Sequence, residues 1–149
     1  MEEKLISDLN DFLQKKLEEK TKKEFNAEEE KKKWINSVNE IVSNIKSWLD
    51  EPVKNKLVEV TDEEIEINEE LLGKYKIKSL IIRSLWDTIY IRPIGRMILG
   101  AVGRIDILST KGKYSILLTI DNGWIVKVDG VYKAFDEEVF SEILKVMMA

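Results

Sequence analysis

The chain lacks two residue types that carry much of enzyme chemistry, because none of its 149 residues is histidine or cysteine. Without cysteine there is no disulfide, thiolate nucleophile, cysteine-bound zinc or iron–sulfur cluster. Without histidine there is no Ser-His-Asp triad, histidine base or imidazole metal ligand. The remaining enzyme classes use carboxylates, Lys, Tyr, Arg, Ser or Thr, or a metal bound by oxygen. We therefore expect no catalysis, no metal site and no cofactor.

Long apolar runs are also missing, and every run falls far short of the roughly 20 residues that a membrane helix needs. The acidic start, MEEKLISDLNDF, has none of the features of a signal peptide. The apolar fraction of 44% is too high for a disordered chain. A chain of this length can also bury a core without a metal or a disulfide. These features predict one cytoplasmic domain over residues 1–149, with no membrane association.

Glycine and proline are absent from residues 1–51, where apolar residues recur every three or four positions as in helices. Two stripes result: Leu5, Ile6, Leu9, Phe12, Leu13 and Leu17, and then Trp34, Val38, Ile41, Ile45 and Trp48. Between them, residues 18–33 include 12 charged residues, and Asn26 is a candidate N-cap. We predict a helical hairpin, packed on the sheet or extended as an arm, whose helices are also a candidate surface for self-association. The alternative is one helix through residue 49. In either case Pro52 ends or redirects the helix.

From residue 57 the pattern changes to the two-residue alternation of strands. Expected strands cover residues 58–60, 65–67, 75–84, 88–92, 104–109, 114–120, 124–128 and 131–135. Turn residues separate the last of these, at Asp121-Asn122-Gly123 and Asp129-Gly130. Asp136 can cap a closing helix with an apolar face of Val139, Phe140, Ile143, Leu144 and Met147. The prediction is an α+β fold: an N-terminal helical hairpin, an antiparallel meander of about five to seven strands within residues 57–149, and a C-terminal helix packed on the sheet.

A glycine-rich stretch covers residues 93–103, with glycines at 95, 100 and 103. Gly100 is followed by Ala101 and Val102 where a phosphate-binding P-loop requires Lys and Ser or Thr. The G-x-G-x-x-G spacing of dinucleotide-binding folds is absent as well. Glycines within strands are typical of bulges, bends and close backbone packing, which is the interpretation we adopt. A ligand cleft lined by backbone is the alternative.

The formal charge of −4 conceals two segments of opposite sign. Residues 34–72 hold ten acids and three lysines, a balance of −7, whereas residues 73–113 hold nine basic residues and two acids, a balance of +7. All four arginines lie in the basic segment, among aromatic residues that include Tyr114. The candidate binding residues are Arg83, Trp86, Tyr90, Arg92, Arg96, Arg104 and Lys111. The competing interpretation is that acidic residues 59–70 neutralise these strands within the fold.

Two groups of acids have simple structural interpretations. The glutamates of residues 63–70 are typical of a solvated strand edge that discourages unwanted pairing, although a surface for a basic partner is an alternative. Asp106 lies two residues after Arg104, so the two share a strand face and are expected to form a salt bridge. We favour that pair over an acid–base site at Asp106 or Asp87.

No motif links the chain to a known family. The leading hypothesis is a small non-catalytic binding protein of the adaptor, inhibitor, immunity or assembly-factor class, which acts through a protein–protein interface. The alternative is a nucleic-acid-binding module that uses the arginine and aromatic strand face. A carboxylate- or magnesium-dependent enzyme is third. The identity of the partner does not follow from the sequence.

Overall fold

A computed structural model describes the backbone of residues 2–70, 72–98, 101–119, 121 and 123–149, and their side chains except at 2–7, 20–26, 97–98 and 101. Gly100 and Asn122, and the side chains of Leu5 and Ile6, therefore lie outside the described part of the chain. The protein divides into two compact units, residues 1–33 and 34–149.

The N-terminal segment is one helix, α1 (Glu2–Trp48), followed by the short α2 (Asp50–Lys54). The predicted hairpin turn within residues 18–33 is therefore wrong, and the continuous-helix alternative is correct. Asn26 lies inside α1 and does not cap a helix. The physical reason is that Lys and Glu are strong helix formers and nothing in this stretch breaks the helix. The pair Glu28–Lys31, at 3.0 Å, adds an i,i+3 contact. α1 ends at Trp48, four residues before Pro52, and Pro52 itself lies within α2.

In the first unit, the large described apolar side chains of α1 are solvent-exposed; they include Leu9, Phe12 and Leu13. In the second unit, by contrast, the predicted stripe is buried from Trp34 to Ile45, and Trp48 is half-buried. The stronger of the two stripes thus packs on a core, and self-association through the N-terminal helices stays a prediction.

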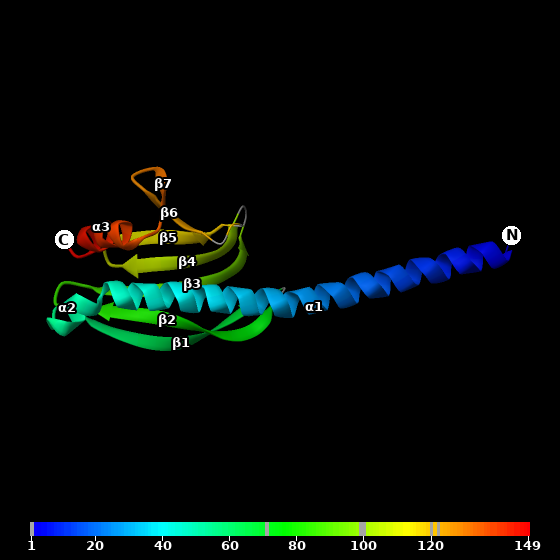
Figure 1. Cartoon of the computed structure of the whole chain (residues 1–149), viewed down its shortest axis with the longest axis horizontal. Helices are drawn as coiled ribbons and strands as arrows, with labels where there is room; N and C mark the ends of the chain where they lie inside the picture. The colour runs from blue at the N-terminus through cyan, green and yellow to red at the C-terminus, as the bar shows by residue number, and fades with distance from the viewer. Residues whose placement is uncertain (1, 71, 99–100, 120, 122) are drawn as a thin grey trace. The chain divides into compact units, whose positions relative to one another are not determined.

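The sheet has seven strands in the order of the sequence, all antiparallel (Figure 1). The strands are β1 (Glu59–Glu69), β2 (Gly73–Arg83), β3 (Thr88–Ile98), β4 (Ala101–Ser109), β5 (Gly112–Leu118), β6 (Trp124–Val128) and β7 (Val131–Ala134). The predicted α+β class, with its N-terminal helices, meander and C-terminal helix, is confirmed. The segments predicted at 58–60 and 65–67 belong to the single strand β1, except Val58, which precedes it.

Turn and cap residues behave as their chemistry predicts. Asp129 and Gly130 both have positive φ, at 52° and 82°, which is the conformation of a two-residue hairpin turn. The closing helix α3 (Glu137–Met147) begins after Asp136, whose side chain accepts a hydrogen bond from the Val139 N–H at 2.9 Å. The predicted apolar face of α3 points into the core, where Phe140 and Ile143 are almost completely buried.

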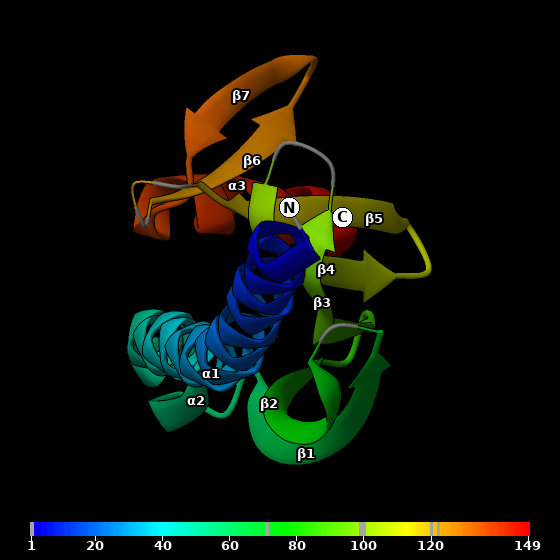
Figure 2. The ribbon, with the colours of Figure 1, turned by 90° about the vertical axis from the view of Figure 1, so that its right-hand side faces the viewer.

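One face of the sheet is covered by helices. Ile91, Ile105 and Val126 are fully buried on this face, and Trp34 of α1 lies against Trp124 with 6.1 Å between ring centroids. Trp48 of α1 contacts Phe140 of α3, at 5.7 Å. Figure 2 shows this part of α1 and α3 on the same side of the central strands. We call this the inner face and the opposite one the outer face.

The glycine-rich stretch contains the bulge and the close packing that the sequence predicted. The pairing of β3 with β4 shifts between Pro93 and Gly95. At Gly103, a Cβ atom would lie 2.7 and 2.8 Å from the Cε3 and Cη2 atoms of Trp34. Only glycine allows the indole of Trp34 to approach β4 this closely.

Candidate binding surface

The outer face is defined by strand alternation and by the pairing of the central strands. Tyr90 pairs with Leu108, Arg92 with Asp106, and Asp106 in turn with Ser115. Directly paired residues point to the same side of a sheet, so these positions form rows across β3, β4 and β5. The residues of this face with a positive charge or a tyrosine ring are Arg83, Tyr90, Arg92, Arg104, Lys113, Lys127 and Tyr132. Basic and aromatic side chains therefore occur on this face from β2 to β7.

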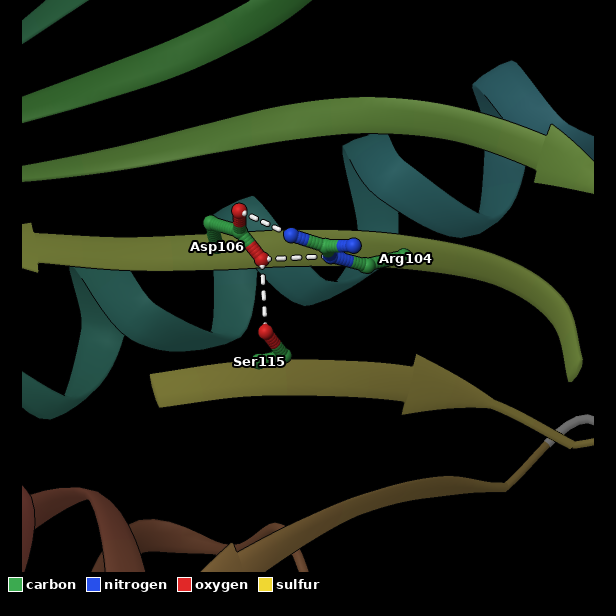
Figure 3. A network of polar contacts seen from close by, with 3 residues as sticks. All are labelled: Arg104, Asp106 and Ser115. Atoms are coloured by element: carbon green, nitrogen blue, oxygen red, sulfur yellow. Dashed lines mark hydrogen bonds and ion pairs between the residues drawn. The ribbon is translucent and has the colours of Figure 1, made fainter. Parts of the chain in front are cut away.

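Asp106 lies within this face and is held in a network of charge-assisted hydrogen bonds (Figure 3). Arg104 donates from Nε and Nη2 to the two carboxylate oxygens of Asp106, both at 2.7 Å, and Ser115 donates to Oδ1 at 2.8 Å. Only 4% of the Asp106 surface is exposed. Burial alone would raise the pKa of Asp106, but the hydrogen bonds from Arg104 and Ser115 outweigh it and lower that pKa. The predicted Arg104–Asp106 pair is confirmed.

This network leaves the neighbouring Arg92 available to a ligand. Arg92 is directly opposite Asp106, but both oxygens of that carboxylate are already bound by Arg104. The exposed Arg92 guanidinium lies 5.8 Å from the ring centroid of Tyr90. Arg83 is also exposed and donates from Nη1 to Thr61 Oγ1 at 3.3 Å. Within the described part of the chain, no ion pair holds Arg83 or Arg92.

The acidic strand β1 lies opposite only part of the basic segment. Glu66 pairs in register with Lys76, Glu64 with Lys78 and Glu59 with Arg83. Self-neutralisation, the competing interpretation of the charge pattern, therefore applies to β2. It does not reach Arg92 or Lys113, because β3 and β5 are not neighbours of β1. The positive charges of Arg92 and Lys113 on the outer face are therefore not offset by the acids of β1.

Trp86 and Lys111 lie in two neighbouring turns at one end of the sheet. Ser84 Oγ accepts hydrogen bonds from the N–H groups of Trp86 and Asp87, at 3.2 and 3.1 Å. Asp87 in turn accepts a 2.7 Å hydrogen bond from the Thr110 hydroxyl, which fastens the β2–β3 turn to the β4–β5 turn. That hydrogen bond is the main reason why the pKa of Asp87 is lowered, and Lys111 adds a smaller electrostatic effect.

The apolar residues of the β2–β3 turn project into solvent, although hydrogen bonds at Ser84 and Asp87 hold the backbone of the turn. Leu85 is 94% exposed and Trp86 is 65% exposed. A hollow beside them is lined by Asp87, Tyr90 and Leu108, so the turn is continuous with the outer face. On its other side, Trp86 borders an apolar groove formed with Pro52, Phe140 and Leu144.

Arg96 is not part of this surface. The bulge brings Arg96 into register with Gly103, which faces Trp34 on the inner side of the sheet. The backbone N–H of Arg96 donates to Glu69 Oε1 at 2.6 Å, and the Tyr75 hydroxyl donates to the other oxygen of the same carboxylate. Burial and the Glu69 carboxylate raise the pKa of Tyr75. This cluster joins the β1–β2 hairpin to β3 and is structural.

Of the seven predicted binding residues, the structure brings four together on the outer face and places Trp86 and Lys111 at its end. Sequence reasoning missed Lys113, Lys127 and Tyr132, because alternation within β5, β6 and β7 does not show which face of each strand lies beside Arg92. Tyr114, considered as a stacking residue, pairs with Ile107 on the inner face and is half-buried.

Three further observations bear on function: possible metal ligands, membrane-spanning helices and similarity to known proteins. Among the described residues, no group of three or more acidic side chains is arranged to hold a metal ion. No described helix is long and apolar enough to cross a membrane. Comparisons with protein-family models, curated proteins and solved structures found no match.

Proposed function

We propose that this protein acts without catalysis and binds an acidic surface of another protein through its outer face. The observation that carries the proposal is the cluster of Arg92 and Lys113 with exposed Tyr90, on a sheet face that α1 from Trp34 onward and α3 leave uncovered. Arginine and tyrosine are enriched in protein interfaces, where they combine contact area with directed hydrogen bonds. A cytoplasmic location is part of this proposal.

The composition of the surface favours a protein over a nucleic acid as the partner. Half-buried Leu108, Leu117 and Ile125 lie between the basic positions, and the exposed Leu85–Trp86 turn extends the same surface. The whole chain carries a formal charge of −4, and a negatively charged protein is not attracted to the phosphate backbone of nucleic acid. Mixed apolar, aromatic and arginine contacts are the usual composition of a protein-binding site.

The chemistry of Asp106 and of the turn residue Asp87 supports binding over catalysis. Asp106 and Asp87 both have a lowered pKa, because each carboxylate accepts several hydrogen bonds. A general acid or base works best with a pKa near the operating pH, and these shifts move both groups away from neutrality. Their arrangement instead orients Arg104 and stabilises the turn that carries Trp86.

Quantitative affinity capture from the cells of origin tests the proposal. The chain is used as bait in three forms: unchanged, with Tyr90→Ala and Arg92→Glu together, and with Lys74→Glu. Lys74 is exposed on β2 opposite Asn68, so its substitution matches the charge change of Arg92→Glu away from the outer face. We expect the same acidic protein with the unchanged bait and the Lys74 variant, and at least tenfold less with the outer-face variant.

Two results would contradict the proposal. One is a captured protein whose recovery is equal for the outer-face variant and the unchanged chain. The other is preferential binding of single-stranded oligonucleotides that weakens steeply with salt and is lost in the outer-face variant. That second result would identify the face as a nucleic-acid site.

A further inference from the structure

The two edges of the sheet differ in their capacity to accept another strand. β1 and β7 are the terminal strands of the sheet. β1 has exposed acids at Glu59, Glu64 and Glu66, and charged side chains of this kind discourage strand pairing. β7 contains no acid and all four of its residues are exposed, with Val131 at 58% and Tyr132 at 56%. The one charged residue of β7, Lys133, lies 3.7 Å from Glu142 of α3, so β7, unlike β1, carries no acid that would repel an added strand rich in acidic residues.

The hydrogen-bond pattern of the β6–β7 hairpin shows which backbone groups point outward. Val131 pairs with Val128 across the two-residue turn, and the Phe135 N–H donates to the Trp124 carbonyl at 2.8 Å. Backbone bonding alternates along an antiparallel strand. Residues 131, 133 and 135 therefore bond to β6, whereas Tyr132 and Ala134 direct their N–H and C=O groups away from it. The edge presents two donors and two acceptors.

The side chains next to this edge indicate the charge of the added strand. Tyr132 lies on the outer face, with the Lys127 ammonium 5.7 Å from its ring centroid. Alternate residues of a strand placed beside β7 would also project on this side. Acidic residues at those positions would meet Lys127 and continue the contacts of the outer face.

A second copy of the chain fits this edge less well. If Tyr132 of one β7 strand paired antiparallel with Ala134 of a second copy, the two Lys133 residues, each 3.7 Å from Glu142 of its own chain, would lie directly opposite each other. Like charges in that position destabilise a strand pair. The charge pattern therefore favours an acidic strand from another protein.

We propose that β7 receives an extended segment of the partner protein as an eighth strand, with acidic residues at the alternate positions that project on the outer side. This inference rests on the proposed function and specifies how the partner docks. Main-chain hydrogen bonds to Tyr132 and Ala134 hold the segment, and Lys127 selects its charge.

The test uses an acetylated, amidated eight-residue peptide of alternating Glu and Val, titrated into the full chain and followed by amide NMR. We expect chemical-shift changes and slower hydrogen exchange at the amides of Tyr132 and Ala134. A peptide of alternating Lys and Val is the charge control and should bind at least tenfold more weakly. Ala134→Pro removes an outward N–H and keeps the bonds to β6, so it should weaken binding at least tenfold. Ala134→Ser keeps the N–H and should bind within twofold of the unchanged chain.

If the amide signals of Val126 and Val128 are the same in Ala134→Pro as in the unchanged chain, this variant retains the β6–β7 hairpin. If those signals change, the Tyr132→Pro variant is used in its place, in the same measurement. The inference is overturned if the Glu-Val peptide fails to bind, if the proline variant binds it normally, or if the shifts map only to Tyr90 and Arg92. Concentration-dependent broadening at β7 without peptide would also overturn it, because a second copy would then occupy the edge. In each case capture of a protein through the outer face remains a separate result, so failure of strand addition is distinguishable from failure of the proposed function.

Discussion

Replacing Gly103 with alanine should destabilise the protein strongly, because the added methyl group has no space. The new Cβ would lie 2.7 and 2.8 Å from two atoms of the Trp34 ring, with Cζ3 closer still. Ordinary carbon–carbon contacts begin near 3.5 Å, so the indole must move by close to an ångström. Trp34 is 1% exposed, its ring centroid lies 6.1 Å from that of Trp124, and it donates a 3.0 Å hydrogen bond to the Tyr75 hydroxyl.

The magnitude follows from two costs. Overpacking a core by one methyl group costs about 1–3 kcal/mol. Moving Trp34 also weakens its bond to Tyr75, and an unsatisfied buried donor costs about 1–3 kcal/mol when the bond is lost. Because relaxation relieves part of each cost, we expect Gly103→Ala to lower the free energy of unfolding by about 3 kcal/mol. For a domain of this size the Tm should fall by about 10 °C.

Urea unfolding followed by tryptophan fluorescence measures this change. Gly123→Ala is the matched control, because its Cβ would lie 3.4 Å from Thr119 Oγ1 and should change stability by less than about 1 kcal/mol. Adding Trp34→Phe to Gly103→Ala should recover part of the loss, since the smaller ring leaves room for the methyl group. A Gly103→Ala protein within about 0.5 kcal/mol of the unchanged chain would refute the packing described for Trp34.

Three further substitutions test the network, the cap and the exposed turn. Asp106→Asn should cost about 1–2 kcal/mol at pH 7, less than a fully buried pair because Arg104 reaches solvent. The pKa of Asp106 in the folded protein is lowered from its usual 3.8, so this stabilisation is present above pH 4 and is lost as the pH falls through the folded pKa. The urea midpoints of the unchanged chain and the Asp106→Asn variant should therefore converge in acid. A difference between the midpoints that stays constant with pH would contradict the ion pair. Asp136→Ala should cost about 1 kcal/mol by removing the cap of α3, measurable by thermal unfolding with Asp136→Ser as the conservative control. Trp86→Ala should leave stability within about 0.5 kcal/mol, because the ring is largely exposed, yet reduce capture of the partner severalfold; equal capture would remove Trp86 from the binding surface.

The local elements could be predicted because their physical signals are local. Two-residue alternation marked the strands, Asp129-Gly130 marked a turn with positive φ, and Asp136 marked the start of α3. The stripe from Trp34 to Ile45 marked the helix face that is buried. Each of these signals lies within a few residues of the feature that it predicts.

The prediction failed where two elements had to be compared. The hairpin in residues 18–33 was inferred from a change in hydrophobic pattern, but a helix needs a breaking residue to end and this stretch has none. Arg96 was grouped with Arg92 and Arg104 because it is close in sequence, yet the bulge at Pro93–Gly95 moves it into register with Gly103. Lys113, Lys127 and Tyr132 joined the surface only once the pairing of β4 to β7 was known.

The most direct test of the central claim is site-specific photo-cross-linking in the cells of origin. A photoreactive phenylalanine analogue replaces Tyr90 on the outer face or, as the control, Val146, which is exposed on α3. We expect a covalent adduct with one acidic protein from position 90 and no such adduct from position 146. Adducts from position 146 alone, or adducts from position 90 that contain nucleic acid and no protein, would contradict it.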